Sequence, residues 1–198
     1  MLTHSDLYSL EQYSSIRDEF KQQAVTHRKN RQVEIGSHMT IHFEDKLSVK
    51  YQIQEMLLIE RTFTAQGIQD ELDAYNPLIP TGTNLKATLT IEYSNPELRA
   101  AMLAKLHRVE DRVYVKVEGH QPVYAIANED MDRSNDVKTA AVHFLRFEFT
   151  PEMIKDMRDT SFAFTVGVDH PEYKEYTRVN TSTKEQLVKD FDENSILA

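Results

Sequence analysis

The sequence predicts an α+β fold, a mostly antiparallel sheet of about five or six strands with helices packed mainly on one face. Segments that alternate apolar and polar residues, typical of half-buried strands, share the chain with segments whose apolar residues recur at helical spacing. A strand–helix–strand pattern also occurs twice in the second half. Because 198 residues suit one large domain, we expect a single domain over residues 1–198.

The first part of the chain, residues 5–80, is expected to be largely helical with one strand. Apolar residues at helical spacing predict a helix over residues 5–30, and Ser9 with Gln12 has the spacing of a capping box. The basic run at 27–31 could contact nucleic acid. We prefer cations that oppose the helix dipole, because the chain as a whole is acidic.

The next segments continue this helical part. Residues 38–43 alternate as a half-buried strand. Residues 47–63 fit a strand or a helix, and the helix formers in their second half favour a helix from about Val49. That helix places Glu60 on its apolar stripe. A second helix is predicted over residues 68–75, ending where a proline disfavours helical geometry in the residue before it.

The strand-rich part, residues 84–170, holds the two repeated units. In each unit an Asn or Thr caps a helix that begins with Pro and Glu, a favoured helix start. The strings IEYSNPEL and FEFTPEM correspond nearly residue for residue, which an old duplication or independent use of the same chemistry would both explain. The predicted segments are strands over 85–93 and 113–117 around a helix from Pro96, and strands over 142–149 and 162–168 around a helix from Pro151.

Three further segments complete the chain. The sequence predicts one more strand over residues 122–127 and a polar surface loop over residues 128–139. Residues 177–198 are expected to be a charged C-terminal tail with a short helix, in which Ser182 and Glu185 form a capping box. We expect the last residues to be frayed.

Composition limits the classes of function. The net charge of −9 argues against non-specific nucleic-acid binding and against attraction to anionic membranes. The chain contains 0 cysteines, which excludes disulfides, thiolate catalysis and cysteine-ligated metal centres. No apolar run approaches the ~20 residues of a membrane span, and the first residues lack the pattern of a signal peptide. We therefore expect a cytoplasmic protein.

Acidic residues recur inside apolar strings between residues 54 and 93. A carboxylate at the edge of a core needs a partner or a shifted pKa, because desolvating an unpaired charge costs several kcal/mol. These residues therefore predict either a structural ion-pair network or a ligand site. They are Glu55, Glu60, Glu71, Asp73 and Glu92.

Two residues of the string AAVHFLRFEF are further candidates. Alternation places His143 on the core-facing side of the strand and Arg146 on the opposite side. For His143 we prefer a buried, neutral, hydrogen-bonded side chain over a functional one. For Arg146 we predict an ion pair with a carboxylate such as Glu92.

Two short motifs carry open alternatives. Asp169 and His170 at the end of a strand suggest a metal or acid–base site, or simply a cap on the turn that follows. Tyr75 and Asn76, next to Glu71, could bind a polar ligand, although capping of the helix end is the simpler explanation.

Established catalytic motifs are absent from the sequence. It contains no H-E-x-x-H, no G-x-S-x-G and no glycine-rich phosphate loop. It also contains no Glu-x-x-His, so a di-iron bundle is not supported. We therefore assign no metal-ligating residues and leave both metal binding and the cofactor open.

Five blocks of the chain resemble a bacterial family classified as a domain of unknown function: HFEDKLSVKYQIQEMLLIER, GIQDELDAYNPLIPTGTNLKATLTIEY, PVYAIANED, VHFLRFEF and VGVDHPEY. The resemblance covers roughly residues 5–176. It implies a small cytoplasmic protein, often encoded beside rubrerythrin and iron–sulfur or flavin oxidoreductases, and hence a redox or peroxide-stress association. It transfers no catalytic residues. The most family-like strings are Glu55–Arg61, Glu71–Pro80, His143–Glu148 and Asp169–Tyr173.

Two functional hypotheses follow. The first is a non-catalytic accessory or binding protein, a homodimer by default, that acts with a redox partner. The alternative is a metal-dependent or acid–base enzyme that uses Glu60, Glu71, His143, Arg146 and His170. The candidate ligand-site residues are Glu55, Glu60, Arg61, Glu71, Tyr75, Asn76, Glu92, His143, Arg146, Asp169 and His170.

Overall fold

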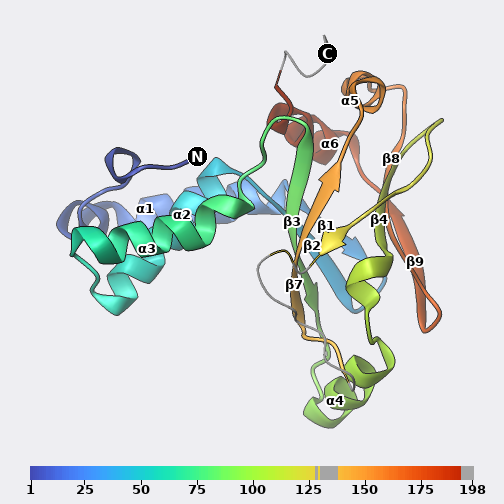
Figure 1. Cartoon of the computed structure of the whole chain (residues 1–198), viewed down its shortest axis with the longest axis horizontal. Coiled ribbons are helices and arrows are strands. Elements are labelled where there is room, and N and C mark those ends of the chain that lie inside the picture. The colour runs from blue at the N-terminus through green and yellow to red at the C-terminus, as the bar shows by residue number, and fades with distance from the viewer. Residues whose placement is uncertain (128, 130–137, 193–198) are drawn as a thin grey trace.

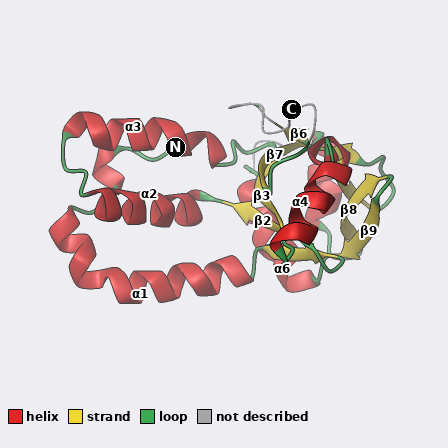
Figure 2. Cartoon of the chain, turned by 90° about the horizontal axis from the view of Figure 1, so that it is seen from below, coloured by secondary structure: helices red, strands yellow, loops and turns green. Residues whose placement is uncertain are grey.

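A computed structural model of the chain describes residues 1–127, 129 and 138–192. It shows a β-sandwich with a helical arm on one side (Figure 1). The arm consists of α1 (Leu10–Lys29), α2 (Lys46–Glu60) and α3 (Ala65–Tyr75), which lie side by side (Figure 2). The other helices, at the ends of the sandwich, are α4 (Pro96–Lys105), α5 (Pro151–Arg158) and α6 (Thr181–Leu187).

The strands in the described residues form two antiparallel sheets, which confirms the α+β class. The five-stranded sheet has the order β1-β2-β3-β7-β6 and the four-stranded sheet the order β5-β4-β8-β9. The strands are β1 (Gln32–Ile35), β2 (Met39–Glu44), β3 (Asn84–Ile91), β4 (Val113–Val117), β5 (Val123–Tyr124), β6 (Ile126–Ala127), β7 (Val142–Glu148), β8 (Phe164–His170) and β9 (Tyr173–Arg178). Where the sequence suggested one sheet, the strands divide between two.

Both predicted strand–helix–strand units cross from one sheet to the other. The first runs β3–α4–β4 and the second β7–α5–β8, with Asn95 and Thr150 as the caps of α4 and α5. The predicted strand over residues 122–127 also changes sheets, since β5 pairs with β4 and β6 pairs with β7. The two sheets are therefore joined repeatedly along the chain.

The inner faces of the two sheets enclose the main hydrophobic core. Alternating residues of each strand point into it, among them Ile41, Leu89, Val115, Phe147 and Val166, all fully buried. The arm has a smaller cluster of its own, which includes Val49, Ile53, Leu57, Leu72 and Ile79. The base of the arm thus packs against the outer face of the five-stranded sheet, and the arm contributes no residues to the sandwich core.

The C-terminal segment differs from the predicted tail. Tyr173–Arg178 is strand β9, paired with β8, and Leu187 and Phe191 are buried in the main core. Strand β1 was also not predicted. Residues 128 and 130–137, most of the predicted polar loop, and residues 193–198, the predicted frayed end, lie outside the described residues.

The cap of α6 also corrects the prediction. Asn180 is the N-cap and accepts a hydrogen bond from the backbone N–H of Thr183 at 2.8 Å, whereas Ser182 only donates its hydroxyl to Asn180. We expect Asn180→Ala to lower the free energy of unfolding by about 1 kcal/mol. The matched change Ser182→Ala is expected to have a smaller effect. Urea unfolding followed by circular dichroism compares the two, and equal losses would contradict the assignment.

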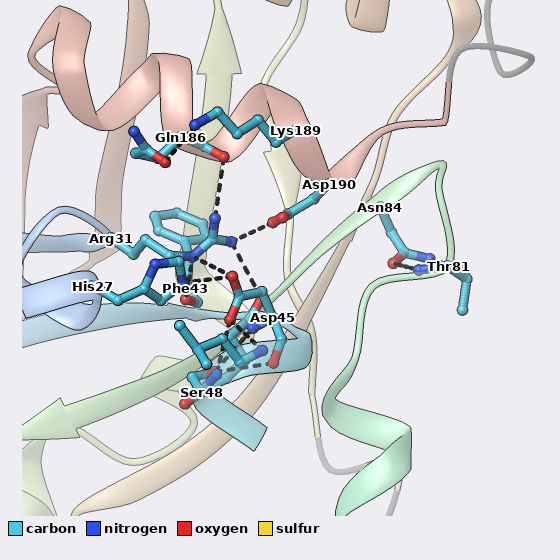
Figure 3. A network of polar contacts seen from close by, with 12 residues as sticks. His27, Arg31, Phe43, Asp45, Ser48, Thr81, Asn84, Gln186, Lys189 and Asp190 are labelled. Carbon is cyan, nitrogen blue, oxygen red and sulfur yellow. Dashed lines mark hydrogen bonds and ion pairs between the residues drawn. The ribbon is translucent and has the colours of Figure 1, made fainter. Parts of the chain in front are cut away.

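A buried guanidinium ties the arm to the sandwich. Arg31, between α1 and β1, is 2% exposed. It donates to the carbonyls of Phe43 (3.1 Å), Glu44 (3.3 Å) and Gln186 (3.1 Å) and to the carboxylate of Asp190. Figure 3 shows these contacts converging from β2 and the C-terminal helical segment.

Asp45 extends this network to the helices. Its carboxylate accepts from the backbone N–H groups of Leu47 and Ser48 as the N-cap of α2, and it lies 3.8 Å from Arg31. His27, in the last turn of α1, contacts the same carboxylate at 2.6 Å (Figure 3). One polar cluster therefore fixes α1, α2, β2 and the C-terminal segment relative to one another.

None of the helices in the described part of the chain has the length and apolar character that a membrane crossing requires.

Candidate functional site between the helical arm and the five-stranded sheet

The outer face of the five-stranded sheet lies under the base of the arm. Register places Glu44 beside Lys86 and Lys86 beside Arg146 across β2, β3 and β7. The next row of the same face holds Thr88 beside Phe144. This face is therefore polar and charged on either side of one aromatic ring.

Phe144 lies between two half-open cavities that are formed by the arm and the sheet. One, of about 300 Å³, lies between α1, α2 and the outer face of the sheet, and the other, of about 400 Å³, lies under α3 and the segment after it. Phe144 lines both. Cavities of this size, between elements that meet at an angle, are the usual location of small-molecule sites.

A buried carboxylate forms part of the smaller cavity. Glu44 is 3% exposed and lines the cavity with Ser48 and Thr88. The Ser48 hydroxyl donates to one carboxylate oxygen at 2.6 Å and the Thr88 hydroxyl to the other at 2.7 Å. Among the described residues no cationic side chain forms an ion pair with it. Two neutral hydroxyls orient this carboxylate but do not balance its charge.

The walls of this cavity are mixed. Val25, Met56, Val142 and Phe144 supply apolar surface, and Arg28, exposed on the last turn of α1, also lines it. We name the whole the Glu44 cavity. Its remaining lining residues are Ala24, Tyr51, Gln52 and Glu55.

The two basic side chains of the sheet that line the larger cavity already have partners. Arg146 donates to both oxygens of Glu129 at 2.7 and 2.8 Å and also to Glu148, which raises the pKa of the guanidinium and lowers that of Glu129. Lys86 donates to the carbonyl of Pro77, and burial lowers the pKa of its amine. Arg146 is thus half of an ion pair, as predicted, but its partners are Glu129 and Glu148 instead of Glu92.

Glu55 is the predicted carboxylate that the structure places at the Glu44 cavity. It is already neutralised, because Arg17 donates to its two oxygens at 2.9 and 2.8 Å and the Tyr13 hydroxyl adds a third bond at 2.7 Å. The bonds from Arg17 lower the pKa of Glu55. The ion-pair interpretation therefore holds for this residue.

Glu60, Arg61 and Glu71 lie at the far end of the arm. Glu60 is exposed, so the prediction that it lies on the apolar stripe of its helix was wrong. The reason is that α2 ends there, with Arg61 in the left-handed region, while the buried stripe stops at Leu57. Burial, followed by the nearby charges of Glu60 and Asp70, raises the pKa of Glu71.

Tyr75 and Asn76 have structural contacts. Tyr75 packs against the small core of the arm. The Asn76 side chain binds the backbone of Leu2 twice, accepting from its N–H at 2.7 Å and donating to its carbonyl at 2.9 Å. These contacts hold the N-terminus of the chain against the arm.

His143 is fully buried and hydrogen-bonded, as preferred from the sequence. Its Nε2 lies 2.9 Å from both the Thr139 hydroxyl and the Ala140 carbonyl, and Thr139 donates to Glu110 at 3.0 Å. Glu110 and His143 are 0% exposed. This cluster stabilises the interior next to β7 and has no lining position in either cavity.

The remaining predicted residues are separate from the arm. His170 Nε2 faces the His107 carbonyl at 3.1 Å, and its Nδ1 accepts from the backbone N–H of Glu172 at 3.2 Å, which supports the turn-cap interpretation. Asp169 is exposed on the outer face of the other sheet, 4.0 Å from Lys174. Glu92 is exposed and accepts from the Thr90 hydroxyl at 3.0 Å.

The predicted residues therefore do not form one cluster. Within the part of the chain that the structure describes, no three His, Asp or Glu side chains gather in a way that could hold a metal ion. Glu44 is a buried carboxylate that sequence reasoning missed. Its signal was available, because alternation from Met39 to Phe43 puts Glu44 on the strand face opposite the core, directly before a helix cap.

Comparison with known proteins gives a family and a fold. The sequence matches, over residues 1–191, a family model described as "Protein of unknown function (DUF3501)". It is 45% identical to a novel protein of unknown function from Burkholderia pseudomallei K96243, with a TM-score of 0.91 to that crystal structure. The match covers 96% of this chain and 99% of that chain. No curated protein matches the sequence. The family match reaches beyond residue 176, where the resemblance seen in the sequence ends.

Proposed function

The chain belongs to the DUF3501 family, whose description assigns no activity, and from the geometry we propose that it is a non-catalytic binding protein that takes a small organic cation into the Glu44 cavity. The observation that carries this proposal is the buried carboxylate of Glu44, which lines a cavity and has no ion-pair partner among the described residues. A non-catalytic protein of this kind has to recognise and bind its ligand, and it does not have to transfer a proton.

The charge of Glu44 determines the class of ligand. An ionised carboxylate out of water costs several kcal/mol unless a cation balances it. The Ser48 and Thr88 hydroxyls hold both oxygens in place and leave lone pairs for a third donor. An ammonium group entering the cavity would supply the missing charge through a charge-assisted hydrogen bond.

The walls determine the rest of the ligand. A volume of about 300 Å³ is at the lower end of the range for small-molecule sites. Phe144, Val142 and Met56 offer apolar contact to a short hydrocarbon body. The cavity therefore suits a small amine better than an acid or a neutral alcohol of the same length.

The test uses n-hexylammonium as the probe, with 1-hexanol and hexanoate as matched controls. We expect hexylammonium to raise the melting temperature and to bind at least about tenfold more tightly than the controls, since a hydrogen bond to a charged group contributes about 1.5–3 kcal/mol. Isothermal titration calorimetry measures the affinities. Equal binding of all three, or none of hexylammonium, would overturn the proposal.

The substitution Glu44→Gln is expected to change ligand binding without lowering the stability of the fold. The amide keeps hydrogen bonds with Ser48 and Thr88, so the free energy of unfolding is expected to stay within about 1 kcal/mol or to rise. The preference for hexylammonium should disappear. The control is Glu55→Gln, which changes a carboxylate of the same cavity that Arg17 already neutralises and should retain the preference. If Glu44→Gln retained it as well, Glu44 would not be the recognition group.

The redox or peroxide-stress association that the family resemblance implies is also part of this proposal, together with a cytoplasmic location and a homodimeric assembly. A strain that lacks the protein should then be more sensitive to hydrogen peroxide. Unchanged sensitivity would contradict the association without affecting the binding test. The mass of the protein in solution tests the homodimer.

A further inference from the structure

The Glu44 cavity contains a second charged group without an ion-pair partner. The charged side chains among its described lining residues are Arg28, Glu44 and Glu55. Glu55 is neutralised by Arg17. The ion pairs between described residues include neither Glu44 nor Arg28. One carboxylate and one guanidinium therefore share this cavity, and they pair neither with each other nor with any other described residue.

Arg28 faces the sheet and α2 from the end of α1. It lies in the last turn of α1, three residues after Val25, which lines the same cavity. Burial lowers the pKa of His42 on β2, and the charge of Arg28 lowers it further. Burial raises the pKa of Tyr51 on α2, and Arg28 is one of the cations that oppose this rise. The guanidinium is therefore close to both elements that form the walls of the cavity.

The two unpaired charges lie at different depths. Glu44 is 3% exposed, and the hydroxyls of Ser48 and Thr88 hold its carboxylate at the floor of the cavity. Arg28 is exposed to solvent and lies at the opening. The wall also includes apolar surface, such as the ring of Phe144. A ligand that meets both charges therefore needs its cation and its anion at opposite ends of a hydrocarbon chain.

We propose that the ligand of the Glu44 cavity is an ω-amino acid, and this inference rests on the proposed function. Its ammonium group binds Glu44 at the floor, and its carboxylate binds Arg28 at the opening. A guanidinium presents paired N–H groups that match the two oxygens of a carboxylate. Because each charge of the ligand meets an opposite charge of the protein, no uncompensated charge is buried.

Other amines complement the cavity less well. An alkylamine satisfies Glu44 but makes no use of Arg28. A phosphorylated amine carries two negative charges, whereas Arg28 supplies one positive charge and is the basic side chain among the described lining residues. The excess negative charge would be repelled by a chain whose net charge is −9. A single carboxylate is the anion that Arg28 balances.

The first experiment compares hexylammonium, 6-aminohexanoate and norleucine by isothermal titration calorimetry. The last two compounds are isomers with the same net charge, but norleucine carries both charged groups at one end. We expect 6-aminohexanoate to bind about fivefold more tightly than hexylammonium, the contribution of a well-formed exposed ion pair. Norleucine should bind no more tightly than hexylammonium. Added salt should reduce the advantage of 6-aminohexanoate, because Arg28 is exposed.

The second experiment removes the guanidinium. Arg28→Gln should reduce the affinity for 6-aminohexanoate to that for hexylammonium, and Arg28→Lys should retain part of the difference. Lys29→Gln is the matched control, because it removes a positive charge from the same turn of α1 and Lys29 does not line this cavity. It should keep the advantage of 6-aminohexanoate. Both positions are exposed, and circular dichroism confirms that each variant is folded.

The outcomes separate this inference from the proposed function. If hexylammonium binds through Glu44 and 6-aminohexanoate has no advantage over it, the proposed function stands and the ω-amino acid is wrong. The same conclusion follows if the advantage survives Arg28→Gln, or if norleucine binds more tightly than 6-aminohexanoate. If neither hexylammonium nor 6-aminohexanoate binds, both proposals are overturned.

Discussion

Replacing Arg31 with methionine is expected to lower the free energy of unfolding by about 3–5 kcal/mol, because breaking a buried ion pair from one side leaves the other side uncompensated. Methionine fills most of the space but donates nothing. The carboxylate of Asp190 and the carbonyls of Phe43 and Gln186 would then lose a buried donor. Each buried acceptor left unpaired adds to the loss.

Urea unfolding monitored by tyrosine fluorescence and circular dichroism measures the effect. Arg17→Met is the control, because Arg17 also pairs with a carboxylate, but its side chain is 41% exposed. Exposed pairs contribute about 0–1 kcal/mol. If the two variants lost similar amounts of unfolding free energy, the burial of Arg31 would not be the reason for the destabilisation.

The second large effect concerns pH. Burial raises the pKa of Asp190 from 3.8 to about 6, against the opposing influence of Arg31 and with a smaller contribution from Asp45. The folded state therefore holds this proton more tightly than the unfolded chain does. The stabilisation is complete below about pH 4 and is lost as the pH rises through about 6. A shift of this size corresponds to about 3 kcal/mol.

Comparison with Asp190→Asn isolates this contribution. The asparagine variant lacks the titrating group, and contributions that the two proteins share cancel in the difference. The free energy of unfolding of the wild type minus that of Asp190→Asn should fall between pH 4 and pH 7 by about 2–2.5 kcal/mol. A difference that is flat or rises over this range would mean that Asp190 is ionised throughout.

The parts of the fold that the sequence predicted are those that local chemistry determines. Ser9 with Gln12 caps α1, and Asn95 and Thr150 cap α4 and α5 as expected. The alternating strands β3 and β7 were also recognisable. Each of these signals lies within about ten residues of the structure it specifies.

The parts that were missed depend on distant contacts. Strand β1 has only 4 residues and β9 is mostly polar. Side chains hold the two strands together, since Thr177 donates to the Glu34 carbonyl and Tyr173 to the Ile35 carbonyl, both at 2.5 Å. The separation of the strands into two sheets has the same origin. No local pattern encodes which sheet a strand joins.

The candidate site also has features that the local sequence predicts and features that depend on distant contacts. Sequence reasoning identified Glu55 and Arg146 as residues that need ionic partners, and both have them. It could not identify the partners, because Arg17 and Glu129 lie elsewhere in the chain. It also looked for acidic residues in apolar strings between residues 54 and 93, and so it selected Glu60, which is exposed, and did not consider Glu44. The burial of Glu44 depends on α2 covering the end of β2.

The contacts of Arg31 also determine when the fold can be completed during synthesis. Arg31 is synthesised early, yet its partners at Gln186 and Asp190 follow 155 and 159 residues later. At about 5–20 residues per second, the nascent chain waits roughly 10–30 s on the ribosome before this arginine can be enclosed. The network around Arg31 can therefore close only after residue 190 has been synthesised, and until then the guanidinium stays in water.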